Sequence, residues 1–275
     1  MNDRVEDHYA NPDIVPRILA AVRQVNGADA PITPDVLAPL DHFHGRGVLA
    51  TREMVAMLQP QAGEQVLDIG SGIGGPARWI AAKFGCHVTG VDLTQAFCDA
   101  AVALNAATGM TERVRILQGN ALALPLPDAT FDRAYSQNVA MNIADKRGMY
   151  REALRVLKPG GVLALSNVCA GPGGDPYFPV PWAATAATSF LVTPEATHDD
   201  LLAAGFEIIQ FRETTQSVLA DQIKDRQRME SGGTLPPLGI HLIIGDRARQ
   251  YRINSARSLE EGRTATIEAL LRKPH

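Results

Sequence analysis

An apolar segment that runs into a glycine-rich turn is the feature that most constrains the fold of this chain. The segment is Val66-Leu-Asp-Ile-Gly-Ser-Gly-Ile-Gly-Gly75-Pro76, which predicts a buried strand, a tight turn and a helix opened by Pro76. Glycines let the backbone turn sharply and approach a ligand closely, and the N-terminus of a helix favours negative groups. This order of elements indicates a ligand-binding unit of an α/β fold.

Short apolar runs alternate with amphipathic stretches from Gln65 onward. We expect strands at Val66–Ile69, His87–Val91, Val114–Leu117, Phe131–Ser136, Gly161–Asn167, Glu207–Phe211 and Thr264–Leu271. Helical patterns lie between the first five strands, at about Pro76–Phe84, Gln95–Ala107 and Lys146–Leu157. The alternation predicts a doubly wound, mostly parallel α/β sheet.

The remaining segments add helices to this core. Residues 1–60 are expected to form an N-terminal helical arm or lid, in which no helix has a strand beside it. Its helices are predicted at Pro12–Val25, from Thr33 onward, and at Val48–Leu58. Residues 61–275 are expected to form the main domain, with a helical insertion at about residues 214–262 and a long connection from Cys169 to Thr193. Long insertions commonly act as lids or partner surfaces.

Composition and charge argue against several kinds of partner. The chain has 26 basic and 30 acidic side chains, a net charge of −4, and no run of five like charges, which argues against nucleic acid or an anionic membrane as partner. Its three cysteines follow no ligand spacing, so we expect reduced thiols and no metal. The charged N-terminus lacks the apolar stretch of a signal peptide. We therefore expect a cytoplasmic protein that acts on a small molecule, with a homodimer as a candidate assembly.

Two carboxylates bear on the meaning of the glycine turn. Gly70, Gly72 and Gly75 also satisfy the fingerprint of dinucleotide binding, so a nucleotide-dependent oxidoreductase stays open as an alternative. Asp68 stands two residues before the first glycine, where a carboxylate would crowd a pyrophosphate but would suit an ammonium group. Asp92 ends the second predicted strand, where it can accept hydrogen bonds from both hydroxyls of a ribose.

With these residues, and with Gly119-Asn-Ala121 and Leu157-Lys-Pro-Gly-Gly161 after them, the chain resembles the class I S-adenosylmethionine-dependent methyltransferases. The resemblance covers about residues 63–211 and the last strand. It implies a seven-stranded Rossmann-like sheet with an antiparallel last strand, S-adenosylmethionine as cofactor and S-adenosylhomocysteine as product. It places these residues at the cofactor: Asp68, Gly70, Ser71, Gly72 and Gly74 around the methionine part, Asp92 at the ribose, Leu93, Asn120 and Ala121 at the adenine, and Gln137. The family usually has Asp at the position of Asn120, whose amide oxygen can also accept from the adenine amino group.

The segment after the fourth strand favours a small-molecule acceptor. It is Ser136-Gln-Asn-Val-Ala-Met-Asn142, where amino-methylating DNA and RNA enzymes carry an Asn/Asp-Pro-Pro-aromatic motif. Together with Asp41-His-Phe-His44 and Phe178-Pro-Val-Pro-Trp182, it makes the chain similar to enzymes of the sarcosine/dimethylglycine N-methyltransferase type. Ubiquinone-biosynthesis and tocopherol methyltransferases are more distant relatives. The expected reaction is methyl transfer to a small molecule, with an amine nitrogen as one candidate acceptor. A non-methylating use of the same cofactor, such as cyclisation, is the alternative.

Candidate acceptor-site residues come from several segments. His44 is a candidate general base or acceptor-orienting group, because an unperturbed imidazole has a pKa of about 6.5; a structural hydrogen bond is the alternative role. Asn138 follows the fourth strand, at the edge where ligands bind in open α/β folds, and is the second catalytic candidate. The expected pocket wall consists of Tyr9, Phe43, Met141, Trp182 and His241. Ordinary core packing is the alternative for the aromatic side chains.

Overall fold

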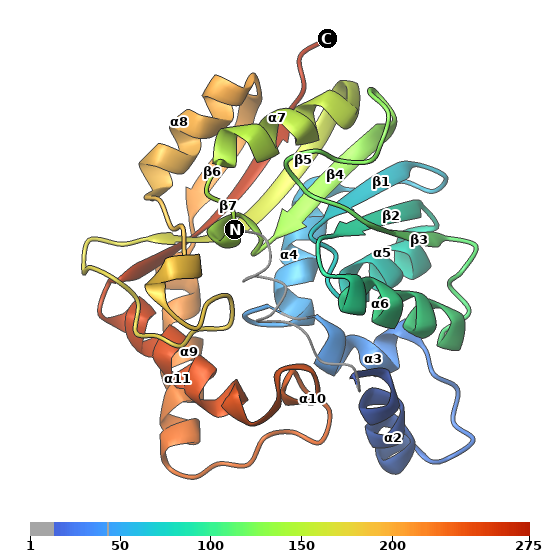
Figure 1. The fold of residues 1–275 in the computed structure, drawn as a ribbon, viewed down its shortest axis with the longest axis vertical. Helices are drawn as coiled ribbons and strands as arrows, with labels where there is room; N and C mark the ends of the chain where they lie inside the picture. Colours follow the sequence, from blue (N-terminus) through green and yellow to red (C-terminus); the bar gives the residue numbers. More distant parts are fainter. Residues whose placement is uncertain (1–13, 43) are drawn as a thin grey trace.

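The computed structural model describes residues 14–42 and 44–275, with a seven-stranded sheet at the centre (Figure 1). The strand order is β3-β2-β1-β4-β5-β7-β6, and β7 is antiparallel to both of its neighbours. The strands are β1 (Gln65–Ile69), β2 (His87–Asp92), β3 (Val114–Gln118), β4 (Phe131–Gln137), β5 (Leu157–Ala170), β6 (Glu207–Glu213) and β7 (Thr264–Arg272). The predicted Rossmann-like sheet with a reversed last strand is confirmed.

Helices cover both faces of this sheet. They are α4 (Val48–Leu58), α5 (Gly75–Phe84), α6 (Gln95–Ala107), α7 (Lys146–Val156) and α8 (Pro194–Ala204). In β1, Val66 belongs to the apolar cluster that contains residues of α4 and α5, whereas Leu67 and Ile69 belong to the one that contains residues of α7 and α8, because successive side chains of a strand point to opposite faces. The strand that ends at the glycine turn is therefore buried from both sides, which holds the turn in place.

The sequence analysis missed α8. Thr193 caps this helix by accepting a hydrogen bond from the backbone of the first turn (3.2 Å), and Pro194 follows it. Only Thr197, Leu201 and Ala204 are buried among its 11 residues. The start signal is thus present in the sequence, but the broad apolar stripe that usually identifies a helix is absent.

The N-terminal helices and the long insertion meet at one end of the sheet. α2 (Ile14–Asn26) and α3 (Pro34–Asp41) contact α10 (His241–Ile244) of the insertion, which also contains α9 (Thr215–Glu230) and α11 (Ala248–Glu260). Figure 1 shows both groups of helices at the same end of the sheet. In contrast, α4 contacts β5 and β7 and contributes Met54 and Leu58 to the core of the sheet. The expectation that no strand lies beside the first helices is therefore wrong for α4.

A buried ion pair fixes α3 to α5. Arg78 Nη2 donates to Asp41 Oδ2 (2.9 Å), and Arg78 Nη1 donates to Asn105 Oδ1 (3.0 Å). Burial raises the pKa of Asp41 and lowers the pKa of Arg78, and their mutual attraction opposes both shifts. Gly75 lies directly against the backbone of Asp41, because a Cβ at this position would be 2.2 Å from the Asp41 carbonyl oxygen. The arm is thus locked to the helix that follows the glycine turn.

We predict that Asp41→Ala lowers the free energy of unfolding by about 3–5 kcal/mol, because it leaves the Arg78 guanidinium buried without a counter-ion. Combining Asp41→Ala with Arg78→Met should recover part of this loss, since no unpaired charge then remains. Urea unfolding followed by circular dichroism measures both variants. A double variant that is no more stable than the single one would contradict this explanation.

Candidate functional site

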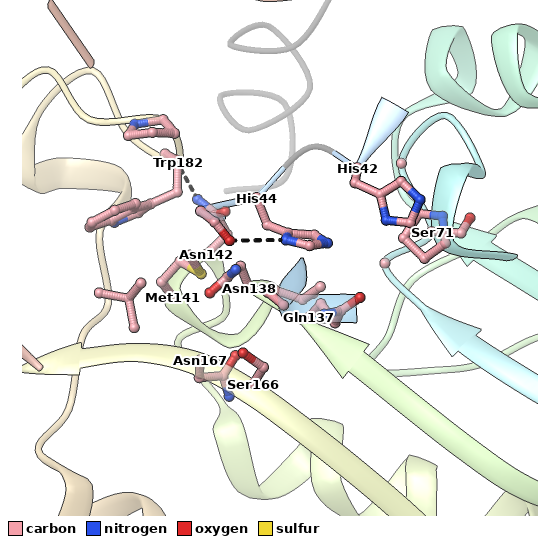
Figure 2. Close-up of a pocket in the computed structure, with 18 of the residues that line it drawn as sticks. His42, His44, Ser71, Gln137, Asn138, Met141, Asn142, Ser166, Asn167 and Trp182 are labelled. Atoms are coloured by element: carbon pink, nitrogen blue, oxygen red, sulfur yellow. Dashed lines mark hydrogen bonds between the residues drawn. The ribbon is translucent and has the colours of Figure 1, made fainter. Parts of the chain in front are cut away.

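A cavity of about 1610 Å³ opens at the carboxyl ends of the parallel strands. Its wall includes the ends of β1, β2, β4 and β5, the segment between α3 and α4, and parts of α9 and α11. Figure 2 shows the part of this wall to which His44, Gln137, Asn138, Met141 and Trp182 belong. Ligand pockets commonly measure about 300–1,000 Å³, so this cavity has room for a cofactor and a second molecule.

The glycines after β1 serve two different purposes. Gly70 and Gly72 have φ angles of 80° and 52°, left-handed backbone that favours glycine, and both line the cavity together with Ser71. Gly74, which was expected at the cofactor, is not among the described residues that line the cavity. It precedes the first turn of α5 as its cap, and a Cβ there would lie 2.9 Å from Arg78 Nη1. We therefore propose a structural role for Gly74.

Asp68 is a buried carboxyl group that lines the cavity, with 3% of its surface exposed. Its Oδ2 makes no hydrogen bond within the described part of the chain. Burial is the main cause that raises its pKa to about 7; Tyr135 lowers the pKa, and the charge of Asp92 raises it. A cationic ligand atom beside Asp68 would favour the ionised carboxylate, so the group is suited to an ammonium.

Asp92 connects the end of β2 to the glycine turn. Its Oδ2 accepts a hydrogen bond from Gly72 N (2.8 Å), and its Oδ1 accepts one from Thr94 N (2.9 Å). Burial raises the pKa of Asp92, and the two backbone hydrogen bonds lower it. Each carboxylate oxygen has a second lone pair. Asp92 can therefore hold the turn and still accept two hydroxyl donors from a ligand.

The residues expected around an adenine also line the cavity. They are Leu93, Asn120 and Ala121, from the segments after β2 and β3. Asn120 Oδ1 accepts a hydrogen bond from Leu122 N (2.9 Å), which fixes the orientation of the amide. The second lone pair of this oxygen can accept from an amino group. The structure thus brings these three residues to the same wall as Asp68 and Asp92.

One hydroxyl group organises the segment around His44. Thr51 Oγ1 lies 2.8 Å from His42 Nδ1 and 3.1 Å from His44 Nε2. It also donates to Gln137 Oε1 (3.1 Å), while His44 Nδ1 lies 3.3 Å from the Gly45 carbonyl oxygen (Figure 2). Burial lowers the pKa of His42 to about 3 and the pKa of His44 to about 4. Both imidazoles are therefore neutral near pH 7.

Asn138 and the connection after β5 complete this part of the wall. Asn138 is a non-glycine residue with a φ angle of 55°, and its N–H donates to the carbonyl oxygen of Ser166 (2.7 Å). Met141 and Trp182 share an apolar cluster, and Trp182 Nε1 donates to Ser189 Oγ (3.0 Å). Both also line the cavity. Trp182 is therefore packed in an apolar cluster and at the same time forms part of the cavity wall.

Two of the expected pocket residues cannot be placed on the wall or away from it, and a third, His241, is not among the described residues that line it. Tyr9 and Phe43 lie outside the described residues. His241 begins α10 and is not among the described cavity-lining residues, whereas Gly239 and Ile240 before it are. Its ring lies near its own loop, because a Cβ on Gly239 would be 3.3 Å from His241 Nδ1. We therefore remove His241 from the pocket wall.

Two buried lining or supporting residues were missed by the sequence analysis. Thr51 is fully buried in α4, and Asn167 is 3% exposed in β5 and lines the cavity. Neither belongs to a motif with known chemistry. The available signal was a polar side chain at a core position of a predicted helix or strand, since such a group needs a hydrogen-bond partner.

Residues 14–42 and 44–275 contain neither a metal-binding cluster nor a membrane-spanning helix. In that part of the chain, no group of three or more His, Cys, Asp or Glu side chains is placed to hold a metal ion. No helix there is long and apolar enough to cross a membrane.

Comparison with known proteins identifies the domain around the glycine turn. Residues 67–165, from β1 to β5, match the family described as methyltransferase domain. The chain contains a methyltransferase domain. The resemblance to class I S-adenosylmethionine-dependent methyltransferases, stated from the motifs, is thereby confirmed.

Known relatives match this chain over its methyltransferase domain, and the match covers only part of their own length. The protein is 38% identical over 120 residues to 24-methylenesterol C-methyltransferase 2 of Oryza sativa subsp. japonica, which is 43% of this chain and 33% of that protein. The solved [4+2]-cyclase SpnF has a TM-score of 0.69 at 23% identity and covers 100% of this chain and 97% of its own. Phosphoethanolamine N-methyltransferase 2 of Haemonchus contortus, in complex with S-adenosyl-L-methionine, has a TM-score of 0.68 at 20% identity, covering 94% and 57%. The two structures show the shared fold.

We predict that Asp92→Ala weakens S-adenosylhomocysteine binding by about 1.5–3 kcal/mol, the usual contribution of a hydrogen bond to a charged group. The ribose loses its acceptor, and Gly72 loses its partner. Asp132→Ala is the matched control, because Asp132 also accepts a backbone hydrogen bond, from Gln65 N (2.9 Å), but does not line the described cavity. Calorimetry measures both. Unchanged affinity in Asp92→Ala would remove Asp92 from the cofactor site.

We also predict that S-adenosylhomocysteine binds more tightly as the pH rises from about 6 to about 8. The Asp68 carboxyl group, with its pKa of about 7, ionises over this range and then attracts the ligand ammonium. Asp68→Asn should flatten the pH dependence and should weaken S-adenosylhomocysteine far more than methylthioadenosine, which lacks the amino-acid part. Calorimetric titrations across this pH range test both statements. Equal losses for the two ligands would mean that Asp68 is structural.

Proposed function

We propose that the protein transfers the methyl group of S-adenosylmethionine to a small-molecule acceptor bound in the same cavity. The observation that carries the proposal is the buried Asp68 carboxyl group, with one oxygen unpaired within the described chain, at the glycine turn of a methyltransferase domain. A dinucleotide would bring its pyrophosphate to this turn, where Asp68 would repel it. The amino-acid end of S-adenosylmethionine would bring an ammonium instead.

The residues of the cavity fit this cofactor. Asp68 would hold the ammonium, the backbone from Gly70 to Gly72 would follow the methionine part, and Asp92 would accept from the ribose hydroxyls. Leu93 and Ala121 offer apolar contacts for the adenine. When bound, the cofactor supplies a methyl group that its sulfonium makes electrophilic. The protein then has to align the acceptor, hold it close and exclude water, and such positioning contributes much of the rate.

On the acceptor side, we assign His44 and Asn138 as orienting groups. The imidazole of His44 is held through Thr51, and its pKa of about 4 makes it a weak base. A role in positioning the acceptor therefore fits the neutral ring better than proton removal. Asn138 lines the same cavity with an amide that can donate and accept.

Water exclusion is assigned to the segments that cross the cavity. We propose that α2 and α3, together with the connection between Cys169 and Thr193, cover the acceptor. α2 and α3 meet α10 of the insertion, while Trp182 and Phe190 of the connection line the cavity. Closed sites strengthen the electrostatic interactions inside them. The boundary of the arm near residue 60, the homodimer and the cytoplasmic location stay predictions.

Two alternatives to methyl transfer remain to be tested. A nucleotide-dependent oxidoreductase would bind a pyrophosphate at the glycine turn. The carboxylate of Asp68 would repel this group. A non-methylating reaction has one observation in its favour, since the solved structure named a [4+2]-cyclase has the same fold over the full length of this chain. Such a reaction would not convert S-adenosylmethionine to S-adenosylhomocysteine.

Calorimetric titration of the protein with S-adenosylhomocysteine and with NAD tests the cofactor assignment. We expect binding of S-adenosylhomocysteine at micromolar concentration and no binding of NAD. Binding of NAD alone would contradict the proposed function. Product analysis after incubation with S-adenosylmethionine and a library of small molecules then separates methylation from cyclisation, because only methylation forms S-adenosylhomocysteine.

We predict that His44→Ala lowers turnover at least tenfold, with an acceptor identified by that library, while S-adenosylhomocysteine affinity changes little. Because burial holds the pKa of His44 at about 4, the wild-type rate should show no inflection from this residue near pH 6.5. His198→Ala is the control, since His198 is exposed on α8 and does not line the described cavity. A rate that is unaffected in His44→Ala would return His44 to a purely structural role.

A further inference from the structure

Buried polar atoms without partners line the cavity beyond those of Asp68 and Ser71 at the glycine turn. Within the described chain, Asn167 Oδ1 and Nδ2 and Ser255 Oγ make no hydrogen bond, and both residues line the cavity. They come from β5 and α11, so they lie on different elements of the wall. Buried polar groups in folded proteins are normally paired, and these are therefore candidates for pairing with a ligand.

Asn167 is the most informative of these groups. It is 3% exposed, and both polar atoms of its side chain are unpaired although it lies next to β7, with Ile267 as its register partner. Figure 2 shows it on β5, in the same part of the wall as Asn138, Met141 and Trp182. An amide offers one acceptor and two donors without charge. It can pair with a hydroxyl or a carbonyl group.

Four charged side chains of this part of the wall lie in ion pairs with close partners. The ion pairs are Arg46 with Glu53 (2.6 Å), Arg252 with Asp225 (2.7 Å), and Glu268 with Arg212 (2.9 Å from Arg212 Nε). Asp145 is exposed and caps α7 through Gly148 N (2.8 Å). A charged acceptor buried beside these ion pairs would have to displace one of the partners, because a buried charge needs a counter-charge.

Apolar side chains form the remaining surface around these groups. Met141, Val168, Trp182, Val218 and Leu259 line the cavity from five different segments of the chain. Such a surface stabilises an apolar molecular body through burial. The wall thus combines a large apolar area with a few uncharged hydrogen-bonding groups.

We propose that the acceptor subsite takes an uncharged, largely apolar molecule whose hydroxyl or carbonyl oxygen is bound by Asn167. This inference rests on the proposed function for the assignment of the other half of the cavity to the cofactor. Phosphorylated and permanently cationic acceptors are excluded by it. The amine acceptor considered from the sequence is restricted to neutral amines.

Three probes with the same chain and different heads test the subsite: 1-octanol, octanoate and octylammonium. Each is titrated calorimetrically at pH 8 into the protein saturated with S-adenosylhomocysteine. We expect 1-octanol to bind at least tenfold more tightly than either charged probe. Equal or tighter binding of a charged probe, or no binding of any of the three, would overturn the proposal.

Two variants locate the effect at Asn167. Asn167→Leu should lower the affinity for 1-octanol at least fivefold. Asn167→Asp should raise the ratio of the octylammonium affinity to the 1-octanol affinity at least tenfold. Asn26→Asp, outside the cavity, is the control and should change neither value. Unchanged probe binding in both Asn167 variants would refute the role of this residue. S-adenosylhomocysteine affinity is measured separately. If the protein does not bind S-adenosylhomocysteine, the proposed function fails. Titration of the free protein with the three probes then still tests the subsite.

Discussion

The ion pair between Asp41 and Arg78 sets the geometry on which the cavity depends. It joins the end of the N-terminal arm to the helix that the glycine turn begins, and Gly75 allows the two backbones to touch. Since His42 follows Asp41 directly, the same contact places the histidine segment over Thr51 and Gln137. A desolvated pair of this kind contributes more to a unique arrangement than to net stability. The arm is therefore part of the wall of the site as well as a cover.

Charge divides the cavity into two parts with different chemistry. On one side, Asp68 and Asp92 are buried carboxyl groups beside the glycine turn, and burial raises the pKa of both. On the other side, Arg46, Asp225, Arg252 and Glu268 lie in ion pairs, and the uncharged amides of Asn138 and Asn167 line the cavity. An ammonium and two ribose hydroxyls suit the first side. A neutral acceptor suits the second side. The charge of each ligand therefore decides which side of the cavity it binds.

The sequence predicted the sheet and the cofactor side because these depend on local patterns. Strand ends, the glycine turn and Asp92 are adjacent in the chain or separated by one helix, so spacing is enough to relate them. Thr51 and Asn167 escaped prediction because they gain meaning only from contacts between distant elements, such as Thr51 with Gln137. Gly74 and His241 show the reverse problem. Both belong to segments that line the cavity, yet neither is among the described residues of its lining.

A crystal structure with bound S-adenosylhomocysteine tests the central claim most directly. The account predicts that the ligand lies between Asp68 and Asn120, with its amino group within hydrogen-bond distance of Asp68 and its ribose hydroxyls on Asp92, while the space around Asn167 stays open for an acceptor. Binding elsewhere would contradict the account. So would a reversed ligand, with its adenine at the glycine turn and its amino group away from Asp68.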